Sequence, residues 1–421
     1  MIDLGRALVV GILLATSAGC ARRSPSPPLI TPTTVRIEIA ARTDTLLIAA
    51  DAALTIETAA GELFRSAPST RLELSPSAER GLLILNATTF AAAPASRWWA
   101  ELASPIRIGS SAKEGIRVAG RSYWGGFQVV RDSSTVRAIN EVDLETYLQG
   151  VVPHEIGLLG DDEIEAIKAQ AVASRTYAFA KLMAATDPLQ ATVMDQVYRG
   201  LEGRSAVVNR AISATRGLIL THSGSPALSL FHSTCAGETA RIEAVWDGAD
   251  PVPYLISIDD RDGSGTPLCA GSKYYSWTES WSRDELLETL RRRLPEEFPD
   301  STFDLAADPD PISIEVLEWT DTGHIRSALI EAWGTDFELP GERLRWVLRR
   351  PGTDSLMRSA RITEIAWNER ALSIQGEGWG HGLGMCQVGA IERARRGEEW
   401  QEILEHYYPG TAIALVSTAL Q

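Results

Sequence analysis

Residues 162–184 read DEIEAIKAQAVASRTYAFAKLMA and have the pattern of one long α-helix. Asp162 is placed to cap the first turn, and a glutamate follows three residues later, as in an acidic variant of the capping box. Ile164, Ile167 and Ala171 recur at spacings of three and four residues and give the helix an apolar face. Because many alanines accompany this face, a neighbouring element can approach it closely. We therefore predict a buried central helix here.

The segments on either side of this helix have the alternation that is typical of β-strands. Ahead of it, apolar and polar residues alternate in residues 35–39, 72–74, 106–108 and 116–118. After it, we predict strands over residues 212–221, 227–232, 312–319, 325–332 and 362–374, and helices over residues 283–293, 387–395 and 400–408. The predicted fold class is α+β, with a β-rich N-terminal region followed by a mixed domain that has a long central helix and several strands.

The length of the chain indicates how many domains to expect, and its charge limits the kinds of partner. A chain of 421 residues exceeds what one small core requires, which favours two domains. We predict a β-rich N-terminal domain over residues 35–130, whose role stays open, and a second domain over residues 131–415. The net charge of −15 and the lack of a long lysine-rich run argue against a nucleic-acid partner, because phosphates attract clusters of Lys and Arg.

The first residues have the pattern of an export signal. Arg6 precedes an apolar run over residues 7–15 that is too short to span a bilayer but suits a signal peptide over residues 1–19. The small residues before Cys20 resemble a bacterial lipobox, which predicts lipidation of Cys20 and a proline-rich tether over residues 20–34. The alternative is an ordinary cleaved signal in which Cys20 has no role. We expect a protein of the cell envelope, lipid-anchored and extracytoplasmic, on the periplasmic face if the organism has an outer membrane.

Five groups of segments together resemble one family. They are YLQGVVPHE (147–155) with AIKAQAVASRTY (166–177), DQVYRG (195–200), ATRGL (214–218) with HSTCAG (232–237), GWGHGLGMCQ (378–387) and HYYPGT (406–411). In this order they resemble the SpoIID/LytB-like family, the group of stage II sporulation protein D and the amidase enhancer, over about residues 120–415. The resemblance implies a cell-wall protein that acts on peptidoglycan glycan strands. Sporulation members resemble lytic transglycosylases, whereas the amidase-enhancer branch stimulates a partner cell-wall amidase.

Glu155 is the residue for which the sequence and the resemblance both indicate chemistry. Cleavage of a glycosidic bond needs a proton on the leaving oxygen, and a lytic transglycosylase can use one carboxyl because the C6 hydroxyl of the substrate is the nucleophile. Glu155 matches the catalytic glutamate of the family, and its apolar neighbours would raise its pKa if they fold around it. We expect a lytic transglycosylase that leaves 1,6-anhydromuramyl ends. The alternatives are a solvated loop glutamate in a non-catalytic, glycan-binding amidase enhancer, and a cysteine hydrolase that pairs a histidine with Cys235 or Cys386.

Several polar and aromatic side chains of the same segments are candidates for glycan binding. The alternatives are a structural ion pair for Arg175, a place in the core for Trp379 and a structural turn for the glycine-rich loop over residues 378–382. The predicted substrate-binding residues are Arg175, Tyr177, His232, Ser233, Trp379 and His381.

The remaining cysteines favour a disulfide over a metal site. An oxidising compartment allows Cys235 and Cys269 to form a disulfide, with free thiols as the alternative. His232 could join these two cysteines around a metal ion, but a fourth ligand is missing, so we predict no metal site and no cofactor. Some members of the family carry a zinc clip of His and Cys ahead of the DQVYRG segment, and residues 185–194 contain neither residue type. Cys386 is expected to be an inert buried thiol.

Overall fold

The computed structural model describes residues 34–416, apart from residues 62, 80, 91–94, 185–187, 301–308, 310 and 369–370. The predicted signal peptide, Cys20 and nearly all of the predicted tether lie outside these residues. Within the described ranges, none of the helices combines the length and the apolar character needed to cross a membrane. The fold class is α+β, as predicted.

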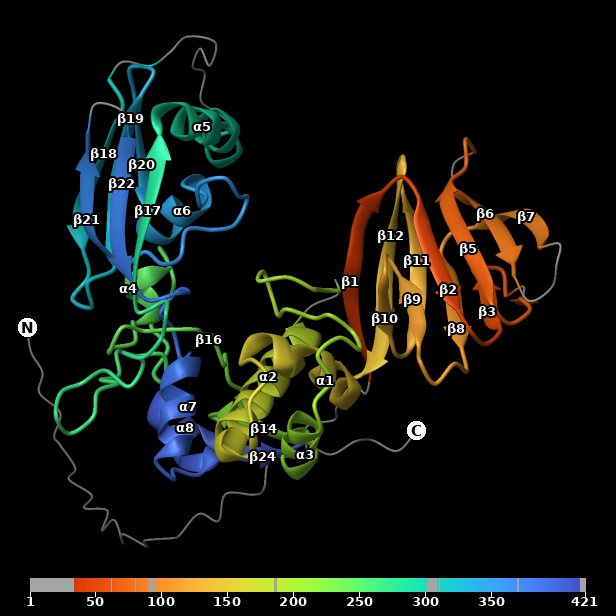
Figure 1. Ribbon diagram of the computed structural model, residues 1–421, viewed down its shortest axis with the longest axis horizontal. Coiled ribbons are helices and arrows are strands. Elements are labelled where there is room, and N and C mark those ends of the chain that lie inside the picture. Colours follow the sequence, from red (N-terminus) through yellow and green to blue (C-terminus); the bar gives the residue numbers. More distant parts are fainter. Residues whose placement is uncertain are drawn as a thin grey trace, which may run out of the picture.

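Two antiparallel sheets build the β-rich region at the right of Figure 1. One sheet has the order β13 (Leu189–Gln190), β1 (Thr34–Thr43), β12 (Thr135–Asp143), β11 (Gly126–Asp132), β8 (Ile106–Ser110), β3 (Leu54–Thr58) and β4 (Leu63–Arg65), with β13 parallel to β1. The other has the order β10 (Arg121–Tyr123), β9 (Ile116–Val118), β2 (Leu46–Ala50), β5 (Thr70–Pro76), β6 (Leu82–Thr89) and β7 (Ser96–Ala103). The four strands predicted ahead of the long helix are confirmed.

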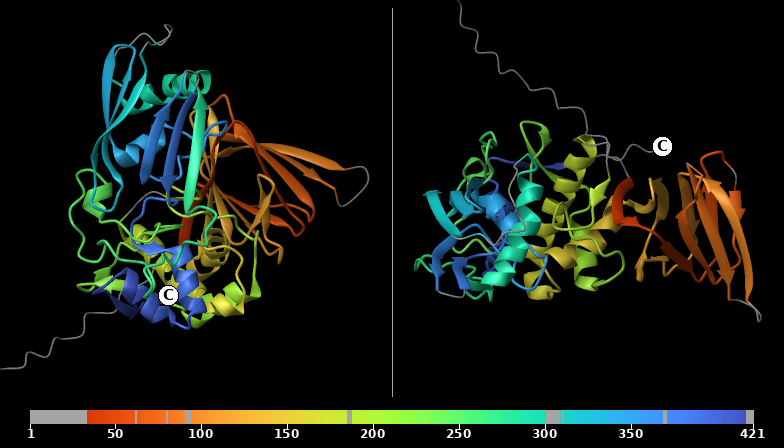
Figure 2. Two further views of the ribbon diagram at one scale, coloured as in Figure 1. Left: turned by 60° about the vertical axis from the view of Figure 1, so that its left-hand side comes forward. Right: turned by 90° about the horizontal axis from the view of Figure 1, so that it is seen from above.

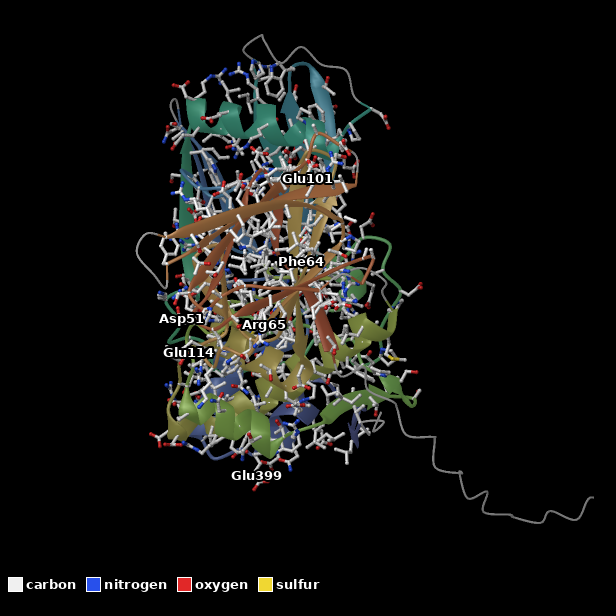
Figure 3. The ribbon with its side chains drawn as sticks, turned by 90° about the vertical axis from the view of Figure 1, so that its right-hand side faces the viewer. Asp51, Phe64, Arg65, Glu101, Glu114 and Glu399 are labelled. Carbon is white, nitrogen blue, oxygen red and sulfur yellow. The ribbon has the colours of Figure 1, made fainter. Side chains whose placement is uncertain are left out.

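The alternating apolar residues of both sheets share one buried core. Ile37 and Ile56 from one sheet, and Ile48 and Leu72 from the other, are fully buried members of it. On the outer face seen in Figure 3, the exposed side chains of Asp51, Arg65, Glu101 and Glu114 project from the β-rich region. Because β12 pairs with β11 and β1, this region continues past residue 130 to Asp143.

The predicted central helix is confirmed as α2 (Ile164–Ala184), most of whose residues are buried. A 3₁₀ turn (Asp161–Glu163) precedes it, so the predicted cap at Asp162 is wrong, and the Glu163 carboxylate accepts the Gly160 N–H at 2.9 Å instead. Around α2 lie α1 (Leu144–Glu155), α3 (Ala206–Ala214), α7 (Gln387–Arg395), α8 (Trp400–Tyr407) and the sheet β15 (Ser225–Pro226), β14 (Leu218–His222) and β24 (Ala412–Leu415). In Figures 1 and 2 these elements form the middle of the molecule.

Residues 276–377 form a unit with its own hydrophobic core. It contains the sheet β17 (Ser276–Ser282), β22 (Ala371–Glu377) and β21 (Ile362–Trp367), the sheet β18 (Ser313–Trp319), β19 (Ile325–Ala332) and β20 (Thr335–Pro340), and helices α5 (Arg283–Glu297) and α6 (Gly341–Val347). The strands predicted over residues 312–319 and 325–332 and the amphipathic helix are confirmed. The single strand predicted over residues 362–374 is instead the hairpin of β21 and β22. The unit interrupts the span predicted as one domain, and it lies across the helical middle from the β-rich region (Figure 2).

The two strand predictions that directly follow α2 are also wrong in part. Residues 212–221 were expected to be one strand, but α3 extends to Ala214 and strand β14 begins only at Leu218. Val208, Ala211 and Ile212 are spaced by three and one residues and are the buried face of α3, so the apolar run belongs to a helix. Of residues 227–232, only β16 (Phe231–His232) is a strand, parallel to β23 (Met385–Cys386), and α4 (Ile242–Val245) follows.

Candidate active site

Glu155 is the last residue of α1, and its carboxylate accepts a hydrogen bond from the backbone of another segment. The helix begins after Asp143, whose carboxylate accepts the N–H groups of Glu145 and Thr146 at 3.0 and 3.2 Å. At the other end, the Val197 N–H donates to Glu155 Oε1 at 2.6 Å. The side chain is partly exposed. Helix α1 and the DQVYRG segment therefore position the carboxyl together.

Gly150 allows the DQVYRG segment to lie against α1. A Cβ atom on Gly150 would be 2.5 Å from the Gly200 carbonyl oxygen and 2.6 Å from the Tyr198 ring. The Arg199 N–H also donates to the Gly150 carbonyl at 3.2 Å. This close approach of two backbones is possible only for glycine, and it brings the Val197 N–H to the carboxyl of Glu155.

Burial raises the pKa of the Glu155 carboxyl to about 7. The hydrogen bond from the Val197 N–H and the Gln387 side chain act in the opposite direction and lower the pKa by less. The side chain keeps some contact with solvent, but protein atoms surround the carboxyl densely enough to disfavour its charged form. A carboxyl with this pKa is partly protonated near neutral pH and can donate a proton.

No cation offsets this effect in the described part of the chain, where Glu155 forms no ion pair. The neighbouring His154 places Nε2 at 2.9 Å from the Glu202 carbonyl oxygen, so this ring is held by the backbone. The carboxyl is thus not held in its ionised form by a positive partner.

A buried polar network connects Gln387 to α2 and α1. Gln387 Nε2 donates to Gln170 Oε1 at 3.2 Å, and Gln170 Nε2 donates to Ser174 Oγ at 3.0 Å. The Ser174 carbonyl accepts Gln196 Nε2 at 3.3 Å, and Tyr147 Oη donates to Gln196 Oε1 at 3.0 Å. These contacts fix both the Gln387 amide, which lies at the start of α7, and the segment that contains Val197.

Arg175, a predicted substrate-binding residue, is instead part of a structural ion pair. Its side chain is 1% exposed, and its Nε and Nη2 donate to the Glu145 carboxylate at 2.7 and 2.8 Å. Its Nη1 donates to the Leu218 carbonyl at 3.1 Å. The guanidinium therefore connects α2, α1 and β14 inside the protein. This is the structural ion pair that was the alternative interpretation of Arg175.

Tyr177 lies on the Glu155 side of α2 and is 8% exposed. Its hydroxyl donates to Asp195 Oδ1 at 2.8 Å, and burial together with Asp195 raises its pKa. The negative charge of Glu155 contributes to the same shift, which indicates that the two side chains are neighbours. Asp195 also accepts the Gln190 N–H at 2.8 Å and pairs with Lys181 at 3.1 Å.

The glycine-rich loop holds Trp379 partly exposed. Trp379 and Thr234 exchange backbone hydrogen bonds of 3.1 and 2.9 Å. The Tyr274 ring meets the Trp379 ring edge-on with centroids 3.9 Å apart, and the Arg350 and Arg358 guanidinium carbons lie 5.6 and 5.5 Å from the Trp379 ring. An accessible indole between two cations and a tyrosine suits contact with a polar ligand that has a flat apolar face.

The other predicted substrate-binding residues differ in accessibility. His381 is partly exposed, its Nδ1 accepts the Leu383 N–H at 3.0 Å, and its ring centre lies 5.8 Å from that of His232. Ser233 is also partly exposed. His232 is only 4% exposed, and burial lowers its pKa to about 4. The prediction that His232 lines a groove is therefore wrong, because the ring is enclosed by the protein.

The expected disulfide is not formed, since Cys235, Cys269 and Cys386 are all buried free thiols. The sulfurs of Cys235 and Cys269 lie 3.7 Å apart. Cys386 belongs to the same group, because its sulfur accepts the Cys235 N–H at 3.4 Å. Burial raises the pKa of the Cys386 thiol well above its usual range, which argues against a nucleophilic thiolate there.

The residues that support Glu155 were not predicted from the sequence. The Val197 contact uses a backbone N–H, which no side-chain pattern indicates. The sequence did contain an indication of the glutamine network. Gln170 and Ser174 are polar residues four positions apart on a helix whose surroundings are otherwise apolar, and this spacing brings two side chains together. Gln387 is the last residue of the GWGHGLGMCQ segment but received no role.

The chain is similar to several known proteins. The family model SpoIID, described as stage II sporulation protein, matches residues 132–222, which include α1, α2 and Glu155. The chain is 30% identical over 305 residues to an uncharacterized protein of Brachyspira hyodysenteriae, covering 72% of this chain and 74% of that protein. It is 28% identical over 301 residues to the amidase enhancer of Bacillus subtilis, covering 63% of this chain and 40% of that protein. It is 27% identical over 299 residues to stage II sporulation protein D of Bacillus subtilis, covering 66% of this chain and 76% of that protein.

Proposed function

Because the chain belongs to the SpoIID family, we propose that it binds the glycan strands of peptidoglycan and cleaves them as a lytic transglycosylase, with Glu155 as the single general acid and base. The observation that carries this proposal is the environment of Glu155. The residue is partly exposed, burial raises the pKa of its carboxyl to about 7, and it forms no ion pair in the described residues. A general acid that works near neutral pH needs these properties.

In the proposed reaction Glu155 acts twice. Its Oε1 accepts the Val197 N–H, so the proton of the neutral carboxyl is carried by Oε2. Oε2 donates this proton to the glycosidic oxygen while the bond to C1 breaks and positive charge develops on the sugar ring. The resulting carboxylate then removes the proton from the C6 hydroxyl of the same sugar. The C6 oxygen bonds to C1, which forms the 1,6-anhydro ring and returns Glu155 to its neutral form.

The same environment supports a one-carboxylate mechanism. A hydrolase that inverts or retains configuration needs a second carboxylate near the bond that breaks. Asp195 follows α2 and contacts Tyr177, but its oxygens already accept hydrogen bonds from Tyr177 and Gln190 and it pairs with Lys181. We therefore assign to Asp195 the role of holding the Tyr177 hydroxyl. The nucleophile is the C6 hydroxyl of the substrate.

Glycan binding in this proposal uses the partly exposed residues Ser233, Trp379 and His381. Trp379 is partly exposed and would contact a sugar ring through its indole, with the guanidinium groups of Arg350 and Arg358 close by for polar groups of the glycan. Arg175, Tyr177 and His232 are left out because all three are buried.

The experiment compares the wild type with Glu155→Gln on purified glycan strands, with and without stem peptides. The variant keeps the shape of the side chain but cannot donate a proton, so we expect turnover to fall by about 10²- to 10⁴-fold. Glu114→Gln is the matched control, because this glutamate is exposed on the β-rich region (Figure 3). Equal turnover by wild type and Glu155→Gln would contradict the proposal.

A second candidate function is that of a non-catalytic protein that binds glycan and stimulates a cell-wall amidase. The 28% identity to the amidase enhancer of Bacillus subtilis favours it. This function predicts retention on glycan without release of products, and a faster amidase reaction when the two proteins are mixed. Glu155→Gln would leave both properties unchanged.

We further propose that residues 1–19 are a signal peptide and that Cys20 anchors the protein by a lipid to the cell envelope. The lipobox-like residues before Cys20 and the proline-rich stretch after it support this location. Incorporation of labelled fatty acid into the wild type, and its loss in Cys20→Ser, would test the anchor.

A further inference from the structure

Four metal-ligating side chains meet beneath the glycine-rich loop, and we propose that they bind one Zn²⁺ ion. They are His232, Cys235, Cys269 and Cys386, here called the Cys3His cluster. The ligand atoms of His232, Cys235 and Cys386 all lie within 4.8 Å of one another, and the Cys269 sulfur lies 3.7 Å from that of Cys235. All four side chains are buried. Three thiolates and one imidazole are a ligand set that tetrahedral structural zinc sites use.

The orientation of His232 is that of a metal ligand. Its Nδ1 lies 3.1 Å from the Leu383 carbonyl oxygen, which can only accept, so Nδ1 carries the hydrogen and Nε2 keeps its lone pair. Nε2 is buried and has no hydrogen-bond partner. A buried acceptor without a partner is unfavourable, and a metal ion would satisfy it. Histidines that bind metals commonly donate the other ring N–H to a carbonyl in this way.

The sulfurs of Cys235 and Cys269 have the spacing of two ligands of one zinc ion. Zn–S bonds of about 2.3 Å in a tetrahedron separate two sulfurs by about 3.8 Å, whereas a disulfide joins them at about 2.05 Å. The 3.7 Å between Cys235 and Cys269 matches the first value. Cys386, whose sulfur lies within 4.8 Å of the ligand atoms of His232 and Cys235, supplies the fourth ligand. The spacing of His and Cys along the chain did not reveal it.

Backbone N–H groups donate to two of the sulfurs, where they would stabilise the thiolates of the metal-bound form. The Gly237 N–H donates to Cys235 Sγ at 3.3 Å, and the Cys235 and Gly389 N–H groups donate to Cys386 Sγ at 3.4 and 3.3 Å. Asp260 Oδ2 lies 3.5 Å from Cys235 Sγ, and Arg393, which pairs with Asp260 at 3.2 Å, offsets this negative charge. Zinc binding would release the thiol protons to solvent.

The position of the cluster assigns the ion a structural role. Strands β16 and β23 pair so that His232 lies beside Cys386, and Cys386 caps α7. The next residue, Gln387, bonds to Gln170 and acts on Glu155. A closed four-ligand site would thus connect β16, β23 and the segment around Cys269 to α7, whose first residue is Gln387. This inference does not depend on the proposed glycan chemistry.

The test is the metal content of the full chain, purified under reducing conditions without chelator. We expect about one zinc per chain, as for a closed four-ligand site, and after exchange with Co²⁺ the absorption of a tetrahedral thiolate complex. Cys386→Ser and His232→Gln should each lose most of the bound zinc. Cys20→Ser and His222→Gln are the matched controls outside the cluster and should keep it.

The wild type alone decides the proposal if the cluster variants fail to fold. A wild-type protein that contains no zinc and shows no thiolate–Co²⁺ absorption would overturn it. So would a thiol titration of the denatured, unreduced protein that finds two thiols fewer than after reduction, because this would reveal a Cys235–Cys269 disulfide.

Discussion

The backbone N–H of Val197 donates a hydrogen bond of 2.6 Å to the Glu155 carboxylate, which joins two segments that lie 42 residues apart. This contact orients the carboxyl without adding a charged partner. Burial can therefore raise the pKa of Glu155 to about 7, which an ion pair would prevent. The expected role of Glu155 as a general acid follows from the fixed orientation of its carboxyl and the lack of a charged partner among the described residues.

The first prediction is the pH dependence of glycan cleavage. Glu155 must be protonated to donate to the leaving oxygen, and its pKa is about 7. Turnover should therefore fall as the pH rises above this value, by about tenfold per pH unit for the loss of a single proton. Initial rates at constant ionic strength over a range of pH would measure it. An increase of the rate with pH across neutrality would contradict the role as acid.

The second prediction concerns the close approach at Gly150. The added Cβ of Gly150→Ala would meet the Gly200 carbonyl at 2.5 Å, so the DQVYRG segment must move away from α1. We expect a loss of about 1–3 kcal/mol in the free energy of unfolding, measured by urea denaturation, together with lower activity as Val197 leaves Glu155. Gly263→Ala is the control, because nothing lies within 4 Å of its added Cβ. Full stability and activity of Gly150→Ala would show that the approach is not needed.

The third prediction separates a structural from a glycan-binding role of Arg175. Arg175→Ala leaves the Glu145 carboxylate buried without its partner, which should cost about 3–5 kcal/mol of folding free energy. The control Arg210→Ala removes an exposed pair with Asp161 and should cost at most about 1 kcal/mol. Thermal and urea unfolding would measure both. An Arg175→Ala protein of normal stability that binds glycan poorly would return Arg175 to the binding site.

The fourth prediction concerns Trp379 as a sugar-stacking residue. Removing a partly exposed aromatic ring should weaken glycan binding by about two- to tenfold, in line with the roughly 0.5–1.5 kcal/mol of a typical aromatic contact. Trp379→Ala should therefore raise the Kd in a glycan pull-down. Trp319→Ala is the matched control, since this residue is 51% exposed on β18. Equal affinities for the wild type and both variants would place Trp379 outside the glycan site.

Local sequence patterns predicted the regular elements well and the contacts between distant segments poorly. The helix at residues 164–184 was predictable because its apolar face repeats along the helix, and β5 because its residues alternate. Helix α3 was missed since Ile212 was read with the strand that follows it. The borders of the unit at residues 276–377, which has its own core, were also missed, because no change in amino-acid composition marks them.

Long-range partners explain why parts of the site were not foreseen. Arg175 meets Glu145 from 30 residues away, and Cys386 meets Cys235 from 151 residues away. No spacing rule along the chain covers such distances, because tertiary packing alone brings these side chains together. Glu155 itself was found through the family resemblance, and its apolar neighbours supplied the physical reason.

The most direct test of the central claim is mass spectrometry of the glycan fragments that the wild type releases from peptide-free strands. If Glu155 removes the proton of the C6 hydroxyl, each cut leaves a 1,6-anhydro ring on the sugar whose C1 bond breaks, and this end is lighter by one water than a reducing end. Glu155→Gln should release none of these fragments above background. New reducing ends from the wild type, or anhydro ends at the full rate from Glu155→Gln, would contradict the account.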